Sequence, residues 1–188
     1  MKGYCFLDVE TTGVNPFEDK IIEIAVILAD ENLKIIQSYE SRLYTPLEYH
    51  NNNGAQNIHK ISPEELLTAP PRKQVMEHVI SMIDKTNLIV NYNVYFDWFF
   101  INAEIQSLQL KRFLAAPSLA VDKRVHLIDI STLSYPLAEI GSIRILSFEA
   151  ICKYFGIVNK KQHSAMSDVL AAIQAFRILK DQMCGSLL

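Results

Sequence analysis

Three strand-forming stretches near the start of the chain constrain its fold more than any other feature. Residues 3–10 alternate along an extended chain, with Cys5, Leu7 and Val9 on one side and Tyr4, Phe6, Asp8 and Glu10 on the other. After a loop rich in Gly, Asn and Pro, residues 21–30 form the β-branched run IIEIAVILAD, and residues 35–44 follow a short turn. These three segments predict an antiparallel meander.

Helix and strand patterns alternate along the rest of the chain. Ser62, Pro63 and Glu65 form a helix-start signature with a capping box, and further helices are expected at 72–84 and 95–110. Short strands are expected at 87–91 and 125–129, and helices at 131–137 and 146–155. The last helix, near 165–183, carries an apolar stripe of Val169, Ile173, Phe176, Leu179 and Met183. We therefore predict an α/β fold: a mixed sheet, in which parallel strands extend the meander, with helices on both faces.

The composition is that of an ordinary globular protein. Apolar residues make up 49% of the 188 residues and charged residues 21%, so we expect one domain over residues 1–188 with a sizeable core. No apolar run is long enough to cross a bilayer, and the charged motif at Asp8 leaves no room for a signal peptide. Cys5, Cys152 and Cys184 are far apart and odd in number, which favours free thiols in a reducing cytoplasm over disulfides or a zinc site.

Asp8 and Glu10 are unusual residues for a half-buried strand. A spacing of two places both carboxylates on one face, a few ångströms apart, where they repel each other and lose solvation. A divalent cation with oxygen ligands would offset that cost. Two side chains that reach solvent at the end of the strand would avoid it altogether. The pair alone leaves both interpretations open.

Two later stretches supply further acids and a histidine. In NYNVYFDWFF, Asp97 lies in the first turn of an aromatic-rich helix that Asn93 is placed to cap, and the helix dipole alone would also favour a carboxylate there. In QHSAMSDVLAA, His163 precedes Asp168 by five residues. We therefore expect His163 on the loop that enters the last helix and Asp168 about one turn inside it.

These three stretches resemble the motifs of a known enzyme family. FLDVETTG, NYNVYFDWFF and HSAMSD are similar, in order and approximate spacing, to the motifs of the DnaQ-like DEDD exonucleases. The His-x-Ala-x-x-Asp form of the third motif is that of the histidine-containing (DEDDh) subgroup. NIHKISPEELLTAPP, VHLIDISTL and LSFEAICKYFGI resemble the segments that connect the motifs, so the resemblance covers the chain from Tyr4 to about Leu179. It implies a ribonuclease H-like fold and a 3′→5′ exonuclease that releases nucleoside monophosphates by two-metal hydrolysis.

The resemblance implies a catalytic role for five residues. Asp8, Glu10, Asp97 and Asp168 would together hold two Mg²⁺ or Mn²⁺ ions. Asp8 would bridge the ions, Glu10 and Asp168 would complete one site, and Asp97 would serve the other. His163 would be the general base that deprotonates the attacking water, which suits an imidazole near neutral pH. Paired metals activate water and stabilise the leaving 3′ oxygen in an in-line displacement.

The resemblance also implies contacts to the nucleic acid. The main chain of Thr11, Thr12 and Gly13, together with His59 and Asn93, would flank the 3′ terminal nucleotide. The net charge of −3 gives by itself no sign of a nucleic-acid partner. Two divalent cations would balance the four carboxylates, however, and only a few terminal nucleotides need holding.

A few prominent residues have simpler explanations. Phe96 and Phe100 could stack on bases, but their helical spacing favours a place in the core. Glu23 lies inside a strand, where we expect a structural ion pair, with Lys20 nearby, rather than a fifth metal ligand.

Three functions from different classes remain open. The favoured one is a free-standing exonuclease on single-stranded 3′ ends, with DNA favoured over RNA. The second is a proofreading subunit of a DNA polymerase assembly, or an RNA-trimming exoribonuclease of the same family; a homodimer is also open. The third is a binding module that has lost catalysis, against which the complete set of five site residues argues.

Asn91 and Tyr92 depart from the Gly-His that often precedes the family's second motif, which affects substrate preference rather than the metal ligands. We expect a cytoplasmic protein without a membrane partner.

Overall fold

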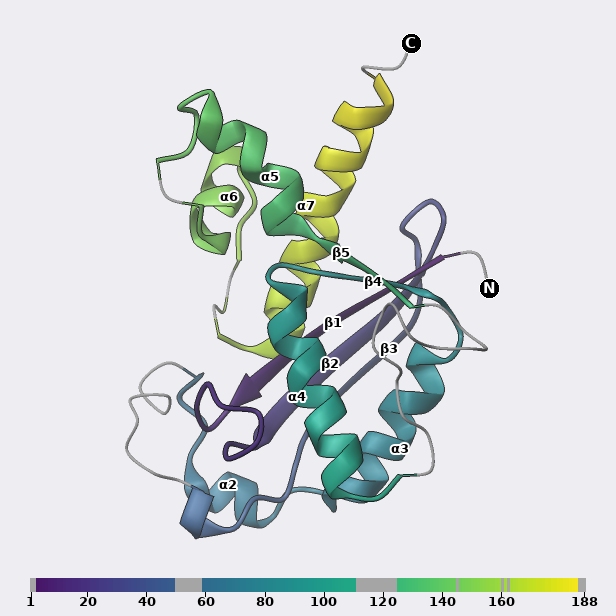
Figure 1. Cartoon of the computed structure of the whole chain (residues 1–188), viewed down its shortest axis with the longest axis vertical. Helices are drawn as coiled ribbons and strands as arrows, with labels where there is room; N and C mark the ends of the chain where they lie inside the picture. The colour runs from purple at the N-terminus through teal and green to yellow at the C-terminus, as the bar shows by residue number, and fades with distance from the viewer. Residues whose placement is uncertain are drawn as a thin grey trace.

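A mixed five-stranded sheet forms the centre of the computed structural model, which describes residues 3–49, 59–110, 125–144, 146–159, 161 and 163–185 (Figure 1). The strands are β1 (Gly3–Thr11), β2 (Ile21–Asp30), β3 (Ile35–Arg42), β4 (Leu88–Asn91) and β5 (His126–Asp129). Their order in the sheet is β3-β2-β1-β4-β5. β1 and β2, and β2 and β3, pair antiparallel, whereas β4 and β5 are parallel to their neighbours. The predicted meander with added parallel strands is confirmed.

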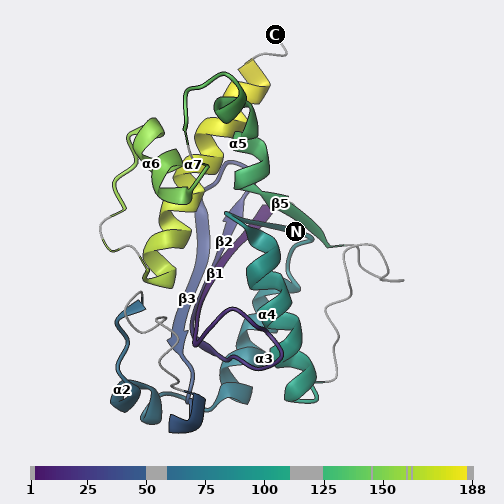
Figure 2. The ribbon, with the colours of Figure 1, turned by 60° about the vertical axis from the view of Figure 1, so that its left-hand side comes forward.

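Helices cover both faces of this sheet, as predicted. They are η1 (Leu47–Tyr49), α2 (Pro63–Leu67), α3 (Arg72–Ile83), α4 (Val94–Ser107), α5 (Ile130–Glu139), α6 (Phe148–Phe155) and α7 (Ala165–Gly185). α3 and α4 pack on one face, and α5, α6 and α7 lie on the other (Figure 2). α2 lies near the end of the sheet where β1 finishes (Figure 1).

The alternation along β1 assigns its residues to two separate cores. Cys5, Leu7 and Val9 pack with α3 and α4, whereas Phe6 packs with α6 and α7. β2 is buried from residue 21 to residue 29, because it is covered on both faces. Asp8 and Glu10 share the face of Phe6, so their side chains point toward α7.

The helices agree with the prediction at the start of α2 and differ from it in α5 and α7. Ser62 and Glu65 form the predicted capping box of α2. α5 continues two residues beyond its predicted end, and Pro136 lies inside it, as it does in the predicted range of 131–137. In α7 the predicted stripe is buried as far as Leu179, but Met183 is 45% exposed, because the end of this helix extends past the sheet (Figure 1).

Candidate active site

A cavity of about 400 Å³ opens where β1 and β4 end and where α4 and α7 begin. The carboxylates of all three predicted motifs and the predicted base line it. The lining residues are Asp8, Val9, Glu10, Asn91, Tyr92, Asn93, Phe96, Asp97, Ser147, Phe148, Glu149, Cys152, Asn159, His163 and Asp168. The structure therefore brings together side chains that are up to 160 residues apart in sequence (Asp8 to Asp168).

Asp8 and Glu10 reach the cavity because they occupy alternate positions of β1. Both are half-buried, and in the register of β1 and β2 they lie opposite Ala25 and Glu23 respectively. The simple alternative, in which both side chains extend freely into solvent, is therefore excluded.

Asp97 is the most buried of the four acids, with 3% of its surface exposed. Its Oδ1 accepts a hydrogen bond from the main-chain N–H of Val9 at 3.0 Å. Its Oδ2 accepts one from the side-chain amide of Asn91 at 3.1 Å, and the same amide donates to Oδ1 of Asp8 at 2.9 Å. Asn91 thus links the carboxylates of the first two motifs.

Asp168 lies in the first turn of α7 and His163 on the loop before it, as predicted. His163 adopts a left-handed backbone conformation with φ of 61°, and its main-chain N–H donates to Oδ2 of Asp168 at 3.1 Å. Asn159 donates to the other oxygen of Asp168 and is itself held by Ser167 at 2.7 Å. Glu10, His163 and Asp168 each present a potential ligand atom, and these atoms lie within 4.8 Å of one another.

Burial raises the pKa of all four carboxylates. The pKa of Asp8 rises to about 8, through burial first and then the charge of Asp168. That of Glu10 also rises to about 8, through burial and the charge of Asp8. The pKa values of Asp97 and Asp168 shift in the same direction, again chiefly through burial. Hydrogen bonds from Asn91 oppose the shift at Asp8 and Asp97. The site without metal therefore retains protons near neutral pH.

This donor set fits hard divalent cations. Carboxylate oxygens are the ligands that Mg²⁺ and Mn²⁺ prefer, and a cation would replace the protons that burial otherwise favours. The candidate ligands form two groups by the contacts that they make. One contains Glu10, His163 and Asp168, and the other contains Asp8 and Asp97, joined by Asn91.

Four of the five predicted substrate contacts lie outside the cavity lining. Thr11 and Thr12 are buried, and the Thr12 hydroxyl receives a hydrogen bond from the main chain of Lys20 at 2.9 Å. Gly13 packs against the Asp19 carboxylate so closely that a Cβ atom would lie 2.3 Å from it, which is a structural reason for glycine. His59 is half-buried and accepts a hydrogen bond from the main chain of Ile61 at 3.0 Å.

Asn93 does line the cavity, but it does not cap α4 in the predicted way. It occupies the N-cap position in a left-handed conformation with φ of 54° and makes no side-chain capping bond. Its main-chain N–H instead donates to Asp129 at 2.9 Å, at the end of β5. This leaves its exposed side chain beside the cavity.

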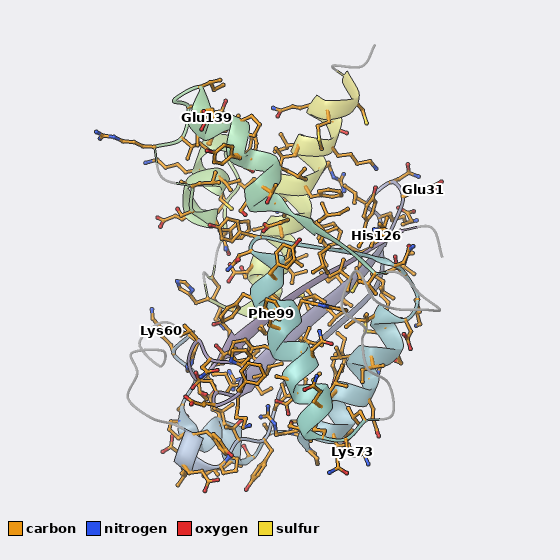
Figure 3. All side chains as sticks on the ribbon, viewed as in Figure 1. Glu31, Lys60, Lys73, Phe99, His126 and Glu139 are labelled. Atoms are coloured by element: carbon orange, nitrogen blue, oxygen red, sulfur yellow. The ribbon has the colours of Figure 1, made fainter. Side chains whose placement is uncertain are left out.

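Aromatic residues form another part of the cavity wall. Tyr92 stacks on Phe148 of α6, with ring centroids 5.3 Å apart and an interplanar angle of 29°. Phe96 is half-buried and also lines the cavity, whereas Phe100 is 2% exposed and belongs to the core, as its helical spacing predicts. Phe99, on the outer face of α4, is 61% exposed (Figure 3). Sequence reasoning did not single out Phe148, Asn159 or the bridging role of Asn91.

The family assignment follows from comparison with known proteins. The family model described as RNase_T: Exonuclease matches residues 5–176. DNA polymerase III PolC-type from Ureaplasma parvum is 26% identical over 182 residues, covering 96% of this chain and 12% of the relative. Oligoribonuclease from Chromobacterium violaceum is 22% identical over 195 aligned positions, covering 94% of this chain and 92% of the relative.

Solved structures share the fold. The zinc-ion-bound form of the E. coli exonuclease I complex with single-stranded DNA matches with a TM-score of 0.79 at 22% identity, covering 97% of this chain and 41% of that one. The chain thus spans less than half of exonuclease I and about an eighth of the polymerase. The likeness confirms the predicted ribonuclease H-like fold. Among the described residues, none of the helices is long and apolar enough to cross a membrane. The chain belongs to the RNase_T exonuclease family, the DnaQ-like DEDD exonucleases that its three motifs predict.

Proposed function

We propose that this chain is a metal-dependent 3′→5′ exonuclease that removes nucleoside monophosphates from single-stranded nucleic acid, with DNA favoured over RNA. The observation that carries the proposal is the convergence of four carboxylates and one imidazole on a single cavity of about 400 Å³. The five residues are Asp8, Glu10, Asp97, His163 and Asp168. Their complete retention argues against a binding module that has lost catalysis.

The four carboxylates would hold two Mg²⁺ or Mn²⁺ ions. When bound, such ions supply Lewis acidity to the attacking water and to the leaving 3′ oxygen. Asp8 would bridge the two ions, Glu10 and Asp168 would complete one site with it, and Asp97 would serve the other. The spatial grouping of Glu10 with Asp168, and of Asp8 with Asp97, supports this division.

His163 is the proposed general base. An imidazole nitrogen takes the proton of the water whose oxygen attacks the phosphorus, while the bond from phosphorus to the 3′ oxygen breaks. The leaving 3′ oxygen takes a proton from solvent, so the products are a nucleoside 5′-monophosphate and a strand with a new 3′-hydroxyl. The exposure of His163 and its place beside Glu10 and Asp168 support the role, because the base must reach both water and substrate.

The aromatic wall is suited to the terminal base. Stacking on an aromatic ring contributes about 1–3 kcal/mol per base and tolerates any sequence. Tyr92, Phe148 and Phe96 line the cavity next to Asn93, so we assign the 3′ nucleotide to this wall. The main chain of residues 11–13 and the His59 side chain remain proposed contacts outside the cavity. The DNA complex of exonuclease I supports a single-stranded substrate.

The test uses 5′-labelled single-stranded DNA and RNA of equal sequence, each incubated with Mg²⁺, Mn²⁺ or chelator. We expect a ladder that shortens stepwise from the 3′ end only when metal is present, and faster on DNA. Single strands and frayed ends should react faster than blunt duplex. Cleavage in excess chelator, or products that begin at the 5′ end, would refute the proposal. A faster rate on RNA would favour an RNA-trimming enzyme.

A proofreading role is the second candidate, favoured by the match to the polymerase from Ureaplasma parvum. In that case the chain would bind a DNA polymerase and excise mismatched 3′ ends faster than matched ones. Two measurements test the proofreading role: co-purification with polymerase subunits, and the excision rates of mismatched and matched 3′ ends. Light scattering on the purified protein separates a homodimer from a monomer.

A further inference from the structure

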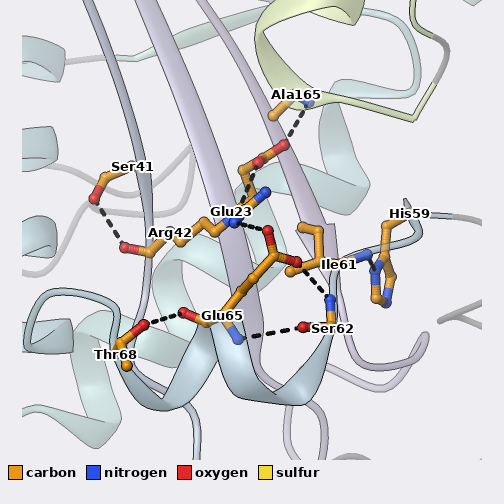
Figure 4. A network of polar contacts seen from close by, with 9 residues as sticks. All are labelled: Glu23, Ser41, Arg42, His59, Ile61, Ser62, Glu65, Thr68 and Ala165. Carbon is orange, nitrogen blue, oxygen red and sulfur yellow. Dashed lines mark hydrogen bonds and ion pairs between the residues drawn. The ribbon is translucent and has the colours of Figure 1, made fainter.

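The ion pair between Glu23 and Arg42 lies beside the proposed active site but belongs to none of its motifs (Figure 4). Glu23 of β2 is 7% exposed and lies opposite Glu10 in the sheet register. Its Oε1 is 3.6 Å from Nε of Arg42, at the end of β3. Sequence reasoning expected an ion pair with Lys20 nearby; the partner is Arg42. We propose that Glu23, held by Arg42, is a positioning residue that sets Asp168 and His163, an inference that rests on the proposed function.

Glu23 contacts the start of α7 directly. Its Oε2 accepts a hydrogen bond from the main-chain N–H of Ala165 at 3.0 Å, across 142 positions of sequence. Ala165 is the first residue of α7 and is fully buried, so its N–H has no partner within the helix and no access to water. The carboxylate satisfies this donor and is also favoured by the helix dipole.

The proposed catalytic residues lie on either side of that contact. Asp168 follows Ala165 within the first turn, and its N–H donates to the carbonyl of Ser164 at 3.0 Å. His163 precedes Ala165 by two residues and is bound to Asp168 through its main chain. A movement of the N-terminus of α7 away from β2 would therefore displace both side chains relative to Glu10.

Arg42 extends the same network toward α2. Its guanidinium also donates to Oε1 of Glu65 at 2.5 Å, and Glu65 closes the capping box with Ser62 (Figure 4). The residue before Ser62, Ile61, donates its N–H to His59. One arginine thus joins the strand that holds α7 to the segment that carries a proposed substrate contact.

The negative charge of Glu23 is unfavourable toward the other acids of the site. Its charge raises the pKa of Asp8, Glu10 and Asp168, so it adds to the repulsion within an already acidic site. A buried ion pair is often no more stable than apolar residues of the same size. An isoleucine or valine would continue the apolar run of β2 without this repulsion. What a hydrophobic residue could not do is accept the hydrogen bond from Ala165.

The test compares wild type with Glu23→Gln, Arg42→Gln, Arg42→Lys and the double variant Glu23→Gln/Arg42→Gln. The matched control is Glu104→Gln. Glu104 forms an ion pair with Arg72, with 2.6 Å between the guanidinium nitrogen and the carboxylate oxygen, and this pair is more buried than that of Glu23 and Arg42 and lies away from the cavity. Three quantities are measured: kcat and KM on a single-stranded oligonucleotide, the Mn²⁺ concentration for half-maximal activity, and amide hydrogen exchange of residues 163–168 without metal.

We expect Glu23→Gln to lower kcat and raise the Mn²⁺ requirement by about 10–100-fold, with little change in KM, as is usual for groups that orient metal ligands. Arg42→Gln should act in the same direction, and Arg42→Lys should restore part of the loss. The double variant should be no worse than the more damaged single one, because both residues act through one contact. Exchange at residues 163–168 should accelerate in Glu23→Gln. Glu104→Gln should lower the melting temperature but leave kcat and this exchange unchanged.

The two hypotheses fail in different ways. If wild type digests no oligonucleotide with either metal, the proposed function fails, and hydrogen exchange still decides whether Glu23 holds the start of α7. If wild type is active but Glu23→Gln matches it in kcat and Mn²⁺ requirement, the positioning role is refuted. The role is also refuted if exchange at residues 163–168 is the same in Glu23→Gln as in wild type.

Discussion

The main-chain N–H of Val9 donates a hydrogen bond to Oδ1 of Asp97 at 3.0 Å, although 88 positions separate the two residues. Val9 lies between Asp8 and Glu10, so this bond fixes the first turn of α4 against the strand β1, which carries those two acids. The second oxygen of Asp97 accepts a hydrogen bond from Asn91. Both oxygens of the buried carboxylate are thus oriented by the protein itself, which is the preorganisation that a metal site needs.

Asn91→Ala should weaken metal binding. The amide of Asn91 lowers the pKa of Asp8 and Asp97, so its loss would raise both pKa values further and make protons harder to displace. We expect the Mn²⁺ concentration for half-maximal activity to rise about 10–100-fold. Asn102→Ala is the control, because Asn102 also donates from a half-buried side chain, to the carbonyl of Trp98 on α4 at 2.7 Å. Equal Mn²⁺ requirements in the two variants would remove Asn91 from the site.

Much of the site could be predicted because it depends on local periodicity. The two-residue period of a strand places Asp8 and Glu10 on one face, and capping chemistry locates Ser62 at the start of a helix. The order of the motifs, together with the family resemblance, then predicted that Asp97, His163 and Asp168 join them. Each step used either neighbours in sequence or a pattern shared by the family.

The remaining features depend on contacts between distant segments. Asn91 bridges two carboxylates, and Glu23 binds Ala165 across 142 positions, and no local spacing indicates either contact. Asn93 is a residue type that often caps helices, but here it adopts a left-handed backbone, and its N–H donates to Asp129. The family resemblance implies that the main chain of Thr12 contacts the substrate. No local pattern indicates the role of its side chain, which accepts a hydrogen bond from the main chain of Lys20 and so connects the two ends of the loop.

His163→Ala should lower kcat by about 10²–10⁴-fold if His163 is the base. The rate of the variant should also lose the rising limb of the pH profile, since an imidazole accepts a proton only when it is neutral. Metal binding, measured by calorimetry with Mn²⁺, should change little. His126→Ala is the matched control, because His126 is exposed on the edge strand β5 (Figure 3). A variant with normal turnover and an unchanged profile would assign His163 to structure.

The stability of the metal-free protein should fall as pH rises. Burial raises the pKa of Asp8 and Glu10 to about 8, so the folded state binds protons that the unfolded state releases near pH 4. Their contribution is therefore fully present below about pH 4 and is lost as pH approaches about 8. In chelator, we expect the melting temperature to decrease over this window, with a shallower slope in Glu10→Gln.

Saturating Mn²⁺ should reverse the slope of that pH dependence, because metal competes with protons for the same oxygens and binds more tightly as pH rises. Melting curves recorded in parallel with chelator and with Mn²⁺ provide the comparison. Parallel slopes in the two series would mean that the raised pKa values have no connection to metal binding.

Asp8→Asn should abolish cleavage and leave the metal-free protein as stable as wild type, or more stable. Neutralising Asp8 removes its repulsion with Asp168, Glu10 and Asp97, and residues placed for activity often reduce stability. Metal at a hundredfold excess over Kd should stabilise wild type by about 2.7 kcal/mol. The variant should gain much less, because it has lost the proposed bridging ligand. The measurement is thermal melting of both proteins in chelator and across a Mn²⁺ titration.

Asp181→Asn is the control for this experiment, since Asp181 is an exposed acid near the far end of α7. It should melt like wild type in chelator and show the full gain with Mn²⁺, because the change in net charge is the same but the cavity is intact. If Asp8→Asn instead melts well below both proteins in chelator, then the carboxylate supports the fold. In that case the role of Asp8 would be to accept the hydrogen bond from Asn91. The repulsion among the four acids would then be smaller than their raised pKa values indicate.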